Sequence, residues 1–177
     1  TALKVGKNGN IEVKIGTQSN GQGHATSYAQ IVSEILDIPI DQINIYQGNS
    51  VDIPKGKGTG GSRSMPVGGS ALYNATEKFL QNAKKLLCEN LDVNINSVLY
   101  KKGLFECNRK SFSLSDVSRL LENNTKVLET FAEWSPEQGS FTYPNGTHIC
   151  ELEIDKHSGE IKIISYTVVD DFGKVIN

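Results

Sequence analysis

Two glycine-rich loops, each followed by an amphipathic helix, constrain the fold of this chain more than any other sequence feature. The first loop, Gly16–His24, follows an alternating strand pattern at residues 11–15 and precedes apolar residues at helical spacing over 28–36. The second lies within residues 48–69 and precedes another apolar stripe over 72–87. A repeated unit of strand, loop and helix predicts an α/β fold with two-layer α+β character, in which helices cover a mixed sheet.

The rest of the pattern consists of shorter segments. A second strand is expected near residues 43–46, further strands near 98–100 and 104–107, and a helix near 114–121 with Ser113 as its cap. Residues 129–134 are expected to be extended. The clearest local pattern comes last: apolar and charged residues alternate over 150–154 and 161–163 around a turn at 156–159, and an apolar strand continues to Val169, which predicts a hairpin.

Length and charge narrow the function classes. The chain has 177 residues, which favours one domain, and 18 basic against 20 acidic residues exclude a mainly electrostatic nucleic-acid binder. No stretch approaches the ~18 apolar residues that span a bilayer, and the start lacks the apolar core of a signal peptide. We therefore expect a cytoplasmic protein without a membrane span.

The potential metal ligands are scattered. The three cysteines (Cys88, Cys107, Cys150) and three histidines (His24, His148, His157) form no pair with metal-ligand spacing. We expect all three thiols to be reduced and structural. Any metal should arrive inside a cofactor.

The two glycine loops favour an anionic ligand. Helix N-termini leave backbone N–H groups unpaired, and glycines let a phosphate approach them. The second loop adds Lys55, Lys57 and Arg63 without an acid among them, and hydroxyl donors at Thr59, Ser62 and Ser64. The amides of Gln18 and Gln22 and the ring of His24 suit the edge of a heterocycle. Neither loop matches the P-loop or Rossmann motifs, and the alternative that these glycines only form tight turns stays open.

Taken together, the two loops and the tail resemble the molybdopterin-binding part of the xanthine dehydrogenase, aldehyde oxidase and carbon monoxide dehydrogenase family. The resemblance rests on residues 16–24 with 29–32, on Gly58–Ser64, and on the tail segments 143–148, 153–155, 158–160 and 169–177. The Gly-Thr-x-Gly-Ser-Arg-Ser form is more similar to the carbon monoxide dehydrogenase branch. Asn20 and Ala25 depart from the family pattern.

The resemblance implies a molybdenum–molybdopterin cofactor, often in the cytosine dinucleotide form. The residues that it places against the cofactor come from both loops: Gln18, Gly21, Gln22, Gly23, His24, Thr59, Gly60, Gly61, Ser62, Arg63 and Ser64. It implies no catalytic residue and no metal ligand in this chain, because the family's substrate-side loop would precede Thr1 and its general-base glutamate would follow Asn177. Glu151 and Glu153 are expected on a solvated strand face, and Asp170 and Asp171 as turn or hydrogen-bond anchors.

The resemblance also implies how the chain works. Residues 1–177 would be a single domain, a fragment of the cofactor-binding domain of a large subunit in a molybdenum-dependent oxidoreductase. Its partners would be the remainder of that subunit and iron–sulfur and FAD-binding subunits or domains. Alone, we expect the chain to be inactive, to bind little or no cofactor, and to self-associate through apolar surface beside Val168, Val169, Val175 and Ile176. A stand-alone phosphate or nucleotide module and a structural subunit-interface domain remain alternatives, and carbon monoxide, an aldehyde or a heterocycle could be the parent's substrate.

Overall fold

The computed structural model describes residues 1–6, 8–122, 127–137 and 142–175. The chain divides into two compact units, one of residues 1–140 and one of residues 141–176.

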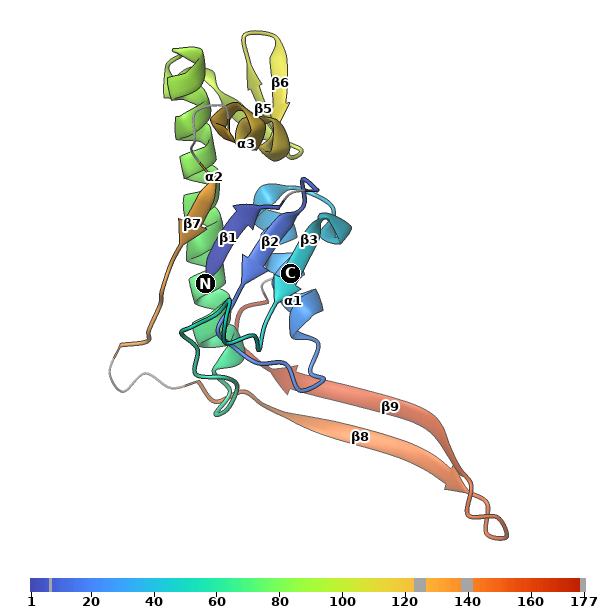
Figure 1. Cartoon of the computed structure of the whole chain (residues 1–177). Coiled ribbons are helices and arrows are strands. Elements are labelled where there is room, and N and C mark those ends of the chain that lie inside the picture. The colour runs from blue at the N-terminus through green and yellow to red at the C-terminus, as the bar shows by residue number, and fades with distance from the viewer. Residues whose placement is uncertain (7, 123–126, 138–141, 176–177) are drawn as a thin grey trace. The chain divides into compact units, whose positions relative to one another are not determined.

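The first unit is built on a four-stranded mixed sheet (Figure 1). Its strands are β1 (Ala2–Val5), β2 (Ile11–Lys14), β3 (Ile43–Tyr46) and β7 (Glu129–Phe131), in the order β3-β2-β1-β7. β2 and β3 run parallel, and β1 is antiparallel to both of its neighbours. A parallel pair needs a crossover, and α1 (His24–Leu36) supplies it, so the expected mixed sheet and the first strand, loop and helix unit are confirmed.

Two helices pack on each other and on this sheet. α2 (Ser70–Leu91) continues from a π-helical turn, η2 (Ser64–Gly69), so the second loop ends at Arg63 and not at Gly69 as the sequence suggested. The expected apolar stripes are buried, with Tyr28, Val32 and Leu36 from α1 and Leu72, Phe79 and Leu87 from α2 at 0–1% exposure. Each helix ends at an aspartate in the left-handed conformation, Asp37 and Asp92.

A small antiparallel sheet and a third helix complete the first unit. The sheet consists of β4 (Leu99–Lys101), β5 (Leu104–Cys107) and β6 (Lys110–Ser113), and α3 (Leu114–Glu122) follows at once. Ser113 caps α3 as expected, since its hydroxyl accepts the Asp116 N–H at 3.1 Å. Two 3-10 turns, η1 (Ile40–Gln42) and η3 (Ile95–Ser97), precede β3 and β4. β1 and β6 have no counterpart in the sequence-based expectation.

The second unit is the expected hairpin. β8 (Asn145–Ile154) pairs with β9 (Ile161–Asp171) in an antiparallel register that joins Ile154 to Ile161. The Asp155 carboxylate accepts the N–H groups of His157 and Ser158, which shapes the turn and holds the pKa of that carboxyl below its usual value. Every residue of both strands is exposed within this structure.

Cys150 is therefore an exposed thiol, and the expectation of a structural cysteine was wrong there; Cys88 and Cys107 are buried, and all three are free.

Candidate functional site

The structure brings the two glycine loops side by side. The Gly58 N–H donates to the Gly16 carbonyl at 3.3 Å, and the Thr59 hydroxyl donates to the Gln18 carbonyl at 2.6 Å. The Gln18 N–H in turn donates to the Thr59 hydroxyl oxygen at 3.3 Å. Residues more than 40 positions apart in the sequence thus form one continuous surface beside the N-terminal ends of α1 and η2.

Glycines allow this close approach. A Cβ on Gly16 would lie 2.6 Å from the Lys55 carbonyl oxygen and 2.8 Å from Gly56 Cα, and a Cβ on Gly56 would lie 2.9 Å from Gly16 Cα. All three obstacles are backbone atoms, which cannot rotate away. Only glycine therefore lets the two loops contact each other at this point.

Below the loops, hydroxyl groups connect them a second time. Tyr28 is fully buried in α1, and its hydroxyl donates to the Ser64 carbonyl at 2.9 Å and lies 3.1 Å from the Thr17 hydroxyl. The Ser64 hydroxyl lies 2.9 Å from that of Thr59. Burial raises the pKa of the Tyr28 phenol, so the hydroxyl stays protonated and keeps its donor.

His24 is buried at the first turn of α1. Its exposure is 6%, its ring lies 5.1 Å from that of Tyr28, and its Nδ1 lies 3.4 Å from the Gln47 amide nitrogen. Gln47 also donates to the Thr17 carbonyl at 3.1 Å. Gln47 was not among the expected site residues, although the parallel pairing of β2 and β3 places the residues after both strands at one edge of the sheet.

The other predicted residues of the first loop lie at its exposed tip. The amides of Gln18 and Gln22 bond within the loop, the former to Asn20 Oδ1 at 3.3 Å and the latter to the Gln18 carbonyl at 3.4 Å. Gly21 and Gly23 have φ values of 102° and 75°, and a Cβ on either would meet nothing within 4 Å. The backbone here faces open space.

The second loop has the same openness and carries a half-buried cation, Arg63. Gly60 and Gly61 would also offer a Cβ no contact within 4 Å, and Ser62 is exposed at a φ of 52°. The Arg63 guanidinium donates from Nη2 to the Lys57 carbonyl, while its buried Nε has no hydrogen-bond partner among the described residues. A buried unpaired donor beside open glycine backbone fits a ligand that carries anionic oxygens.

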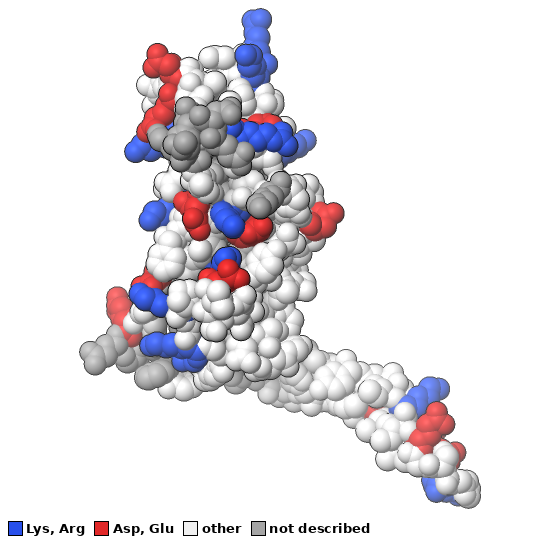
Figure 2. Space-filling view, in the orientation of Figure 1, with Lys and Arg blue, Asp and Glu red and all other residues white. Residues whose placement is uncertain are grey.

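The second loop has no acid among Lys55, Lys57 and Arg63, but an acid from a distant part of the sequence lies near one of them. Glu133 lies 3.5 Å from the ammonium group of Lys55, so the chain supplies an acid near the second loop. Both side chains are more than half exposed, which keeps their interaction weak. Figure 2 shows basic and acidic side chains interspersed on the face in view, as expected from the nearly neutral total.

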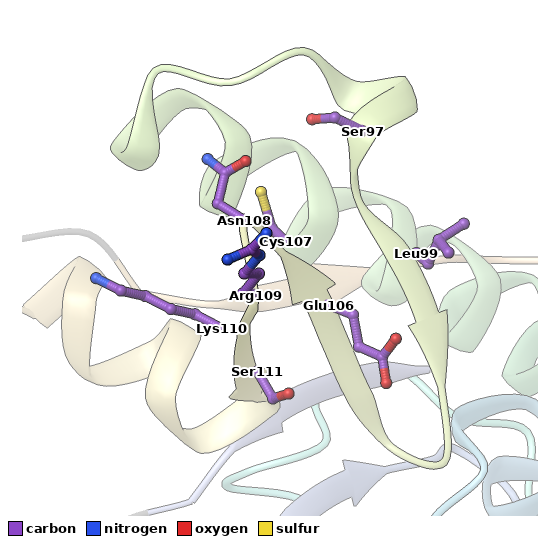
Figure 3. A pocket seen from close by; sticks show the side chains of 8 residues that line it. All are labelled: Ser97, Leu99, Glu106, Cys107, Asn108, Arg109, Lys110 and Ser111. Atoms are coloured by element: carbon purple, nitrogen blue, oxygen red, sulfur yellow. The ribbon is translucent and has the colours of Figure 1, made fainter.

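One surface hollow lies away from the two loops. It measures about 320 Å³ and is lined by β4, the β5–β6 turn and their flanks: Ser97, Leu99, Glu106, Cys107, Asn108, Arg109, Lys110 and Ser111. In Figure 3 the Lys110 and Glu106 side chains point in different directions and do not converge on a ligand. α2 is about 33 Å long at 1.5 Å per residue and separates this small sheet from the loops (Figure 1).

Neither metal ligands nor a membrane span can be assigned within the described ranges. His, Cys, Asp and Glu side chains there form no group of three or more that could hold a metal ion. The helices of the same ranges are too short or too polar to cross a bilayer.

Comparison with known proteins gives one consistent family. The model of the molybdopterin cofactor-binding domain matches residues 1–177. The carbon monoxide dehydrogenase large chain of Hydrogenophaga pseudoflava is 32% identical over 99% of this chain and 22% of its own length. Aldehyde oxidase 4 of Rattus norvegicus is 26% identical over 89% of this chain and 11% of its own. The structure of reconstituted CO dehydrogenase from Oligotropha carboxidovorans matches 96% of this chain and 22% of that chain, with 30% identity and a TM-score of 0.74.

Proposed function

Because the chain belongs to the molybdopterin cofactor-binding domain family, we propose that its paired glycine loops form one side of a molybdenum cofactor site in a larger oxidoreductase. The observation that carries this proposal is the hydrogen-bonded junction of the two loops, with open glycine backbone and the unpaired Arg63 Nε beside it. Family membership supports molybdopterin as the ligand.

Each part of the junction would contribute a different contact. Gly21, Gly23, Gly60 and Gly61 would let anionic oxygens reach backbone N–H groups, and Arg63 would add a charge-assisted donor. The other predicted contact residues are Gln18, Gln22, His24, Thr59, Ser62 and Ser64. When bound, the molybdenum–pterin group would supply the redox chemistry, and this chain would bind and orient it.

Two roles differ from a simple contact. His24 is buried against Tyr28 and Gln47, so it would act at the floor of the site. The hydroxyl groups of Thr59 and Ser64 bond to each other, and that of Thr59 also bonds to the Gln18 carbonyl. These residues would therefore contribute to ligand binding mainly by fixing the geometry of the loop. We also propose the cytosine dinucleotide form of the cofactor, on the resemblance of the second loop to the carbon monoxide dehydrogenase branch.

The partners follow from the length of the relatives. The chain spans 22% of the carbon monoxide dehydrogenase large chain that it matches. We propose that residues 1–177 form one domain of such a large subunit, which works in the cytoplasm with iron–sulfur and FAD-binding subunits or domains. The general base and the pocket that selects carbon monoxide, an aldehyde or a heterocycle would then lie outside these residues.

The exposed hairpin favours an additional structural role. Large apolar side chains of β8 and β9, such as Leu152, Ile163 and Tyr166, are 46–63% exposed. Figure 2 shows the charged side chains of the hairpin gathered toward its turn. Since exposed apolar surface of this extent marks interaction sites, we propose that the hairpin packs against the remainder of the large subunit.

Metal analysis of the complete large subunit tests the cofactor proposal. We expect close to one molybdenum atom per wild-type polypeptide and a clear loss in Arg63→Gln. Arg109→Gln is the matched control, because Arg109 lies on the β5–β6 turn far along the chain from both loops. A complete complex without molybdenum would overturn the proposed function, and equal metal content in the two variants would remove Arg63 from the site.

A further inference from the structure

The hydroxyl of Tyr28 stands in a hydrogen-bond chain with a fixed direction. At one end the Gln47 amide nitrogen, which can only donate, lies 2.6 Å from the Thr17 hydroxyl oxygen. At the other end the Ser64 carbonyl, which can only accept, receives the Tyr28 proton at 2.9 Å. The Thr17 hydroxyl must therefore donate to Tyr28, and every proton in the chain points from β3 toward the second loop.

A second directed chain completes a ring. The Thr59 hydroxyl uses its proton on the Gln18 carbonyl, so the Ser64 hydroxyl must donate to Thr59. Thr17 and Gln18 are neighbours in the sequence. The ring therefore runs from Thr17 through Tyr28, Ser64 and Thr59 to Gln18, and it crosses between the two loops twice.

Tyr28 is the residue of this hydrogen-bond ring whose side chain has the least freedom to move. Its side chain is fully buried, and a Cβ on Gly68 would lie 2.8 Å from its hydroxyl, so η2 packs directly against it. Every other hydroxyl of the ring sits on one of the two loops or at the start of η2, whereas Tyr28 is anchored in the core of α1. It connects the rigid part of the unit to the open backbone above it.

On the basis of the proposed function, we propose that Tyr28 is a positioning residue of the cofactor site. Its hydroxyl sets the register of Gly58–Ser64 against the first loop, so the backbone donors of both loops face the ligand together. It touches no ligand itself. Loss of the hydroxyl alone should loosen the second loop and weaken cofactor retention. The aromatic ring of residue 28 should stay packed in the core.

The experiment compares Tyr28→Phe with Tyr100→Phe in the complete large subunit. Tyr100 is the control, because its half-buried side chain also donates its hydroxyl proton to one backbone carbonyl, that of Leu36 at 2.6 Å, away from the loops. We measure hydrogen exchange of the amides in residues 58–64 of cofactor-free protein, and the half-life of bound molybdenum during dialysis of loaded protein. Tyr28→Phe should raise loop exchange about five-fold and shorten the half-life by a similar factor, as expected for one net hydrogen bond. Tyr100→Phe should change neither.

A third variant distinguishes loss of the hydrogen-bond ring from general destabilisation as the cause of faster loop exchange. Thr17→Val removes the donor to Tyr28 and should reproduce the faster loop exchange, and the double variant should be less than additive because the same ring is already broken. Loop exchange and molybdenum half-life equal to those of Tyr100→Phe would overturn the role of Tyr28. A wild-type subunit without molybdenum would overturn the proposed function instead, while the exchange comparison still decides whether Tyr28 fixes the loops.

Discussion

At the scale of single residues, some glycines of the two loops allow a close backbone contact and others face open space. Alanine substitution distinguishes the two roles. Gly56→Ala places a Cβ against the backbone of Gly16, so we expect a loss of about 1–3 kcal/mol in the free energy of unfolding. Gly60→Ala meets open space and should stay within about 0.5 kcal/mol of wild type. Urea unfolding of the 177-residue chain measures both. Equal stability of the two variants would contradict the close contact between the loops.

The same residues show what the sequence could predict at this scale. The resemblance predicted that both loops would meet one cofactor, whereas the direct bond of Thr59 to Gln18 comes from the structure. Burial of His24 and the part played by Gln47 depend on the ends of β2 and β3 lying together, which a list of loop residues does not contain. The assignment of individual cofactor contacts stays a prediction.

At the scale of elements, the N-terminus of α3 offers a test through pH. Ser113 and Asp116 cap each other: the Asp116 carboxylate accepts the Ser113 hydroxyl at 2.7 Å and its N–H at 2.9 Å, which lowers the pKa of Asp116. A carboxyl with a lowered pKa adds stability that is present above its unfolded value near 3.8 and is lost as the pH falls through the folded value.

Ser113→Ala removes the two contacts of the hydroxyl, to the Asp116 carboxylate and from the Asp116 N–H, and keeps the backbone N–H bond to the carboxylate. We expect a loss of about 1 kcal/mol at pH 7 and a shallower decline of stability than in wild type as the pH falls below about 3.8. Ser111→Ala, at an exposed position in the same strand, is the control and should match wild type. Thermal unfolding followed by circular dichroism gives both results, and an unchanged acid profile in Ser113→Ala would argue against the mutual cap.

Prediction from the sequence found the elements with a long period and the short strands β3, β4, β5 and β7, but it missed β1 and β6. α1, α2 and the hairpin each carry several matching apolar positions, and all three were found. β1 and β6 have four residues each, too few for a period to stand out, and their place comes from pairing with distant strands. The turn η2 contains Pro66, Gly68 and Gly69, which read as loop residues; packing against Thr17 and Tyr28 makes this segment helical.

At the scale of the whole molecule, the share of the relatives that the chain spans bears on activity. A site closed from several sides needs contacts beyond those of the two loops, and each charge-assisted contact contributes on the order of 1.5–3 kcal/mol. We therefore expect the 177-residue chain by itself to oxidise neither carbon monoxide nor aldehydes and to hold little molybdenum. Dye-linked assays and metal analysis check this, and turnover above a buffer control would contradict it.

The hairpin should decide how the separate chain behaves in solution. The register of β8 and β9 places six large apolar side chains on one face: Leu152, Ile154, Ile161, Ile163, Tyr166 and Val168. Each is 46–63% exposed, and together they offer on the order of 500 Å² of apolar surface, comparable to the largest patch that a monomer tolerates. Val169 and Val175 are also 61–69% exposed, as expected, whereas Ile176 lies outside the described residues.

We expect this face to drive self-association, and two charge-matched variants test it. Ile163→Lys with Tyr166→Lys adds two charges to the apolar face, and Ser165→Lys with Thr167→Lys adds the same two to the opposite face. In sedimentation velocity from about 1 to 100 μM, wild type and the second variant should gain mass with concentration, while the first should remain a monomer. Burial of apolar area drives the association, and added charge on the other face leaves that area intact. A wild-type chain that stays monomeric at every concentration would show that the exposed face does not bind the same face of a second copy. The remainder of a large subunit would then be the surface that this face fits.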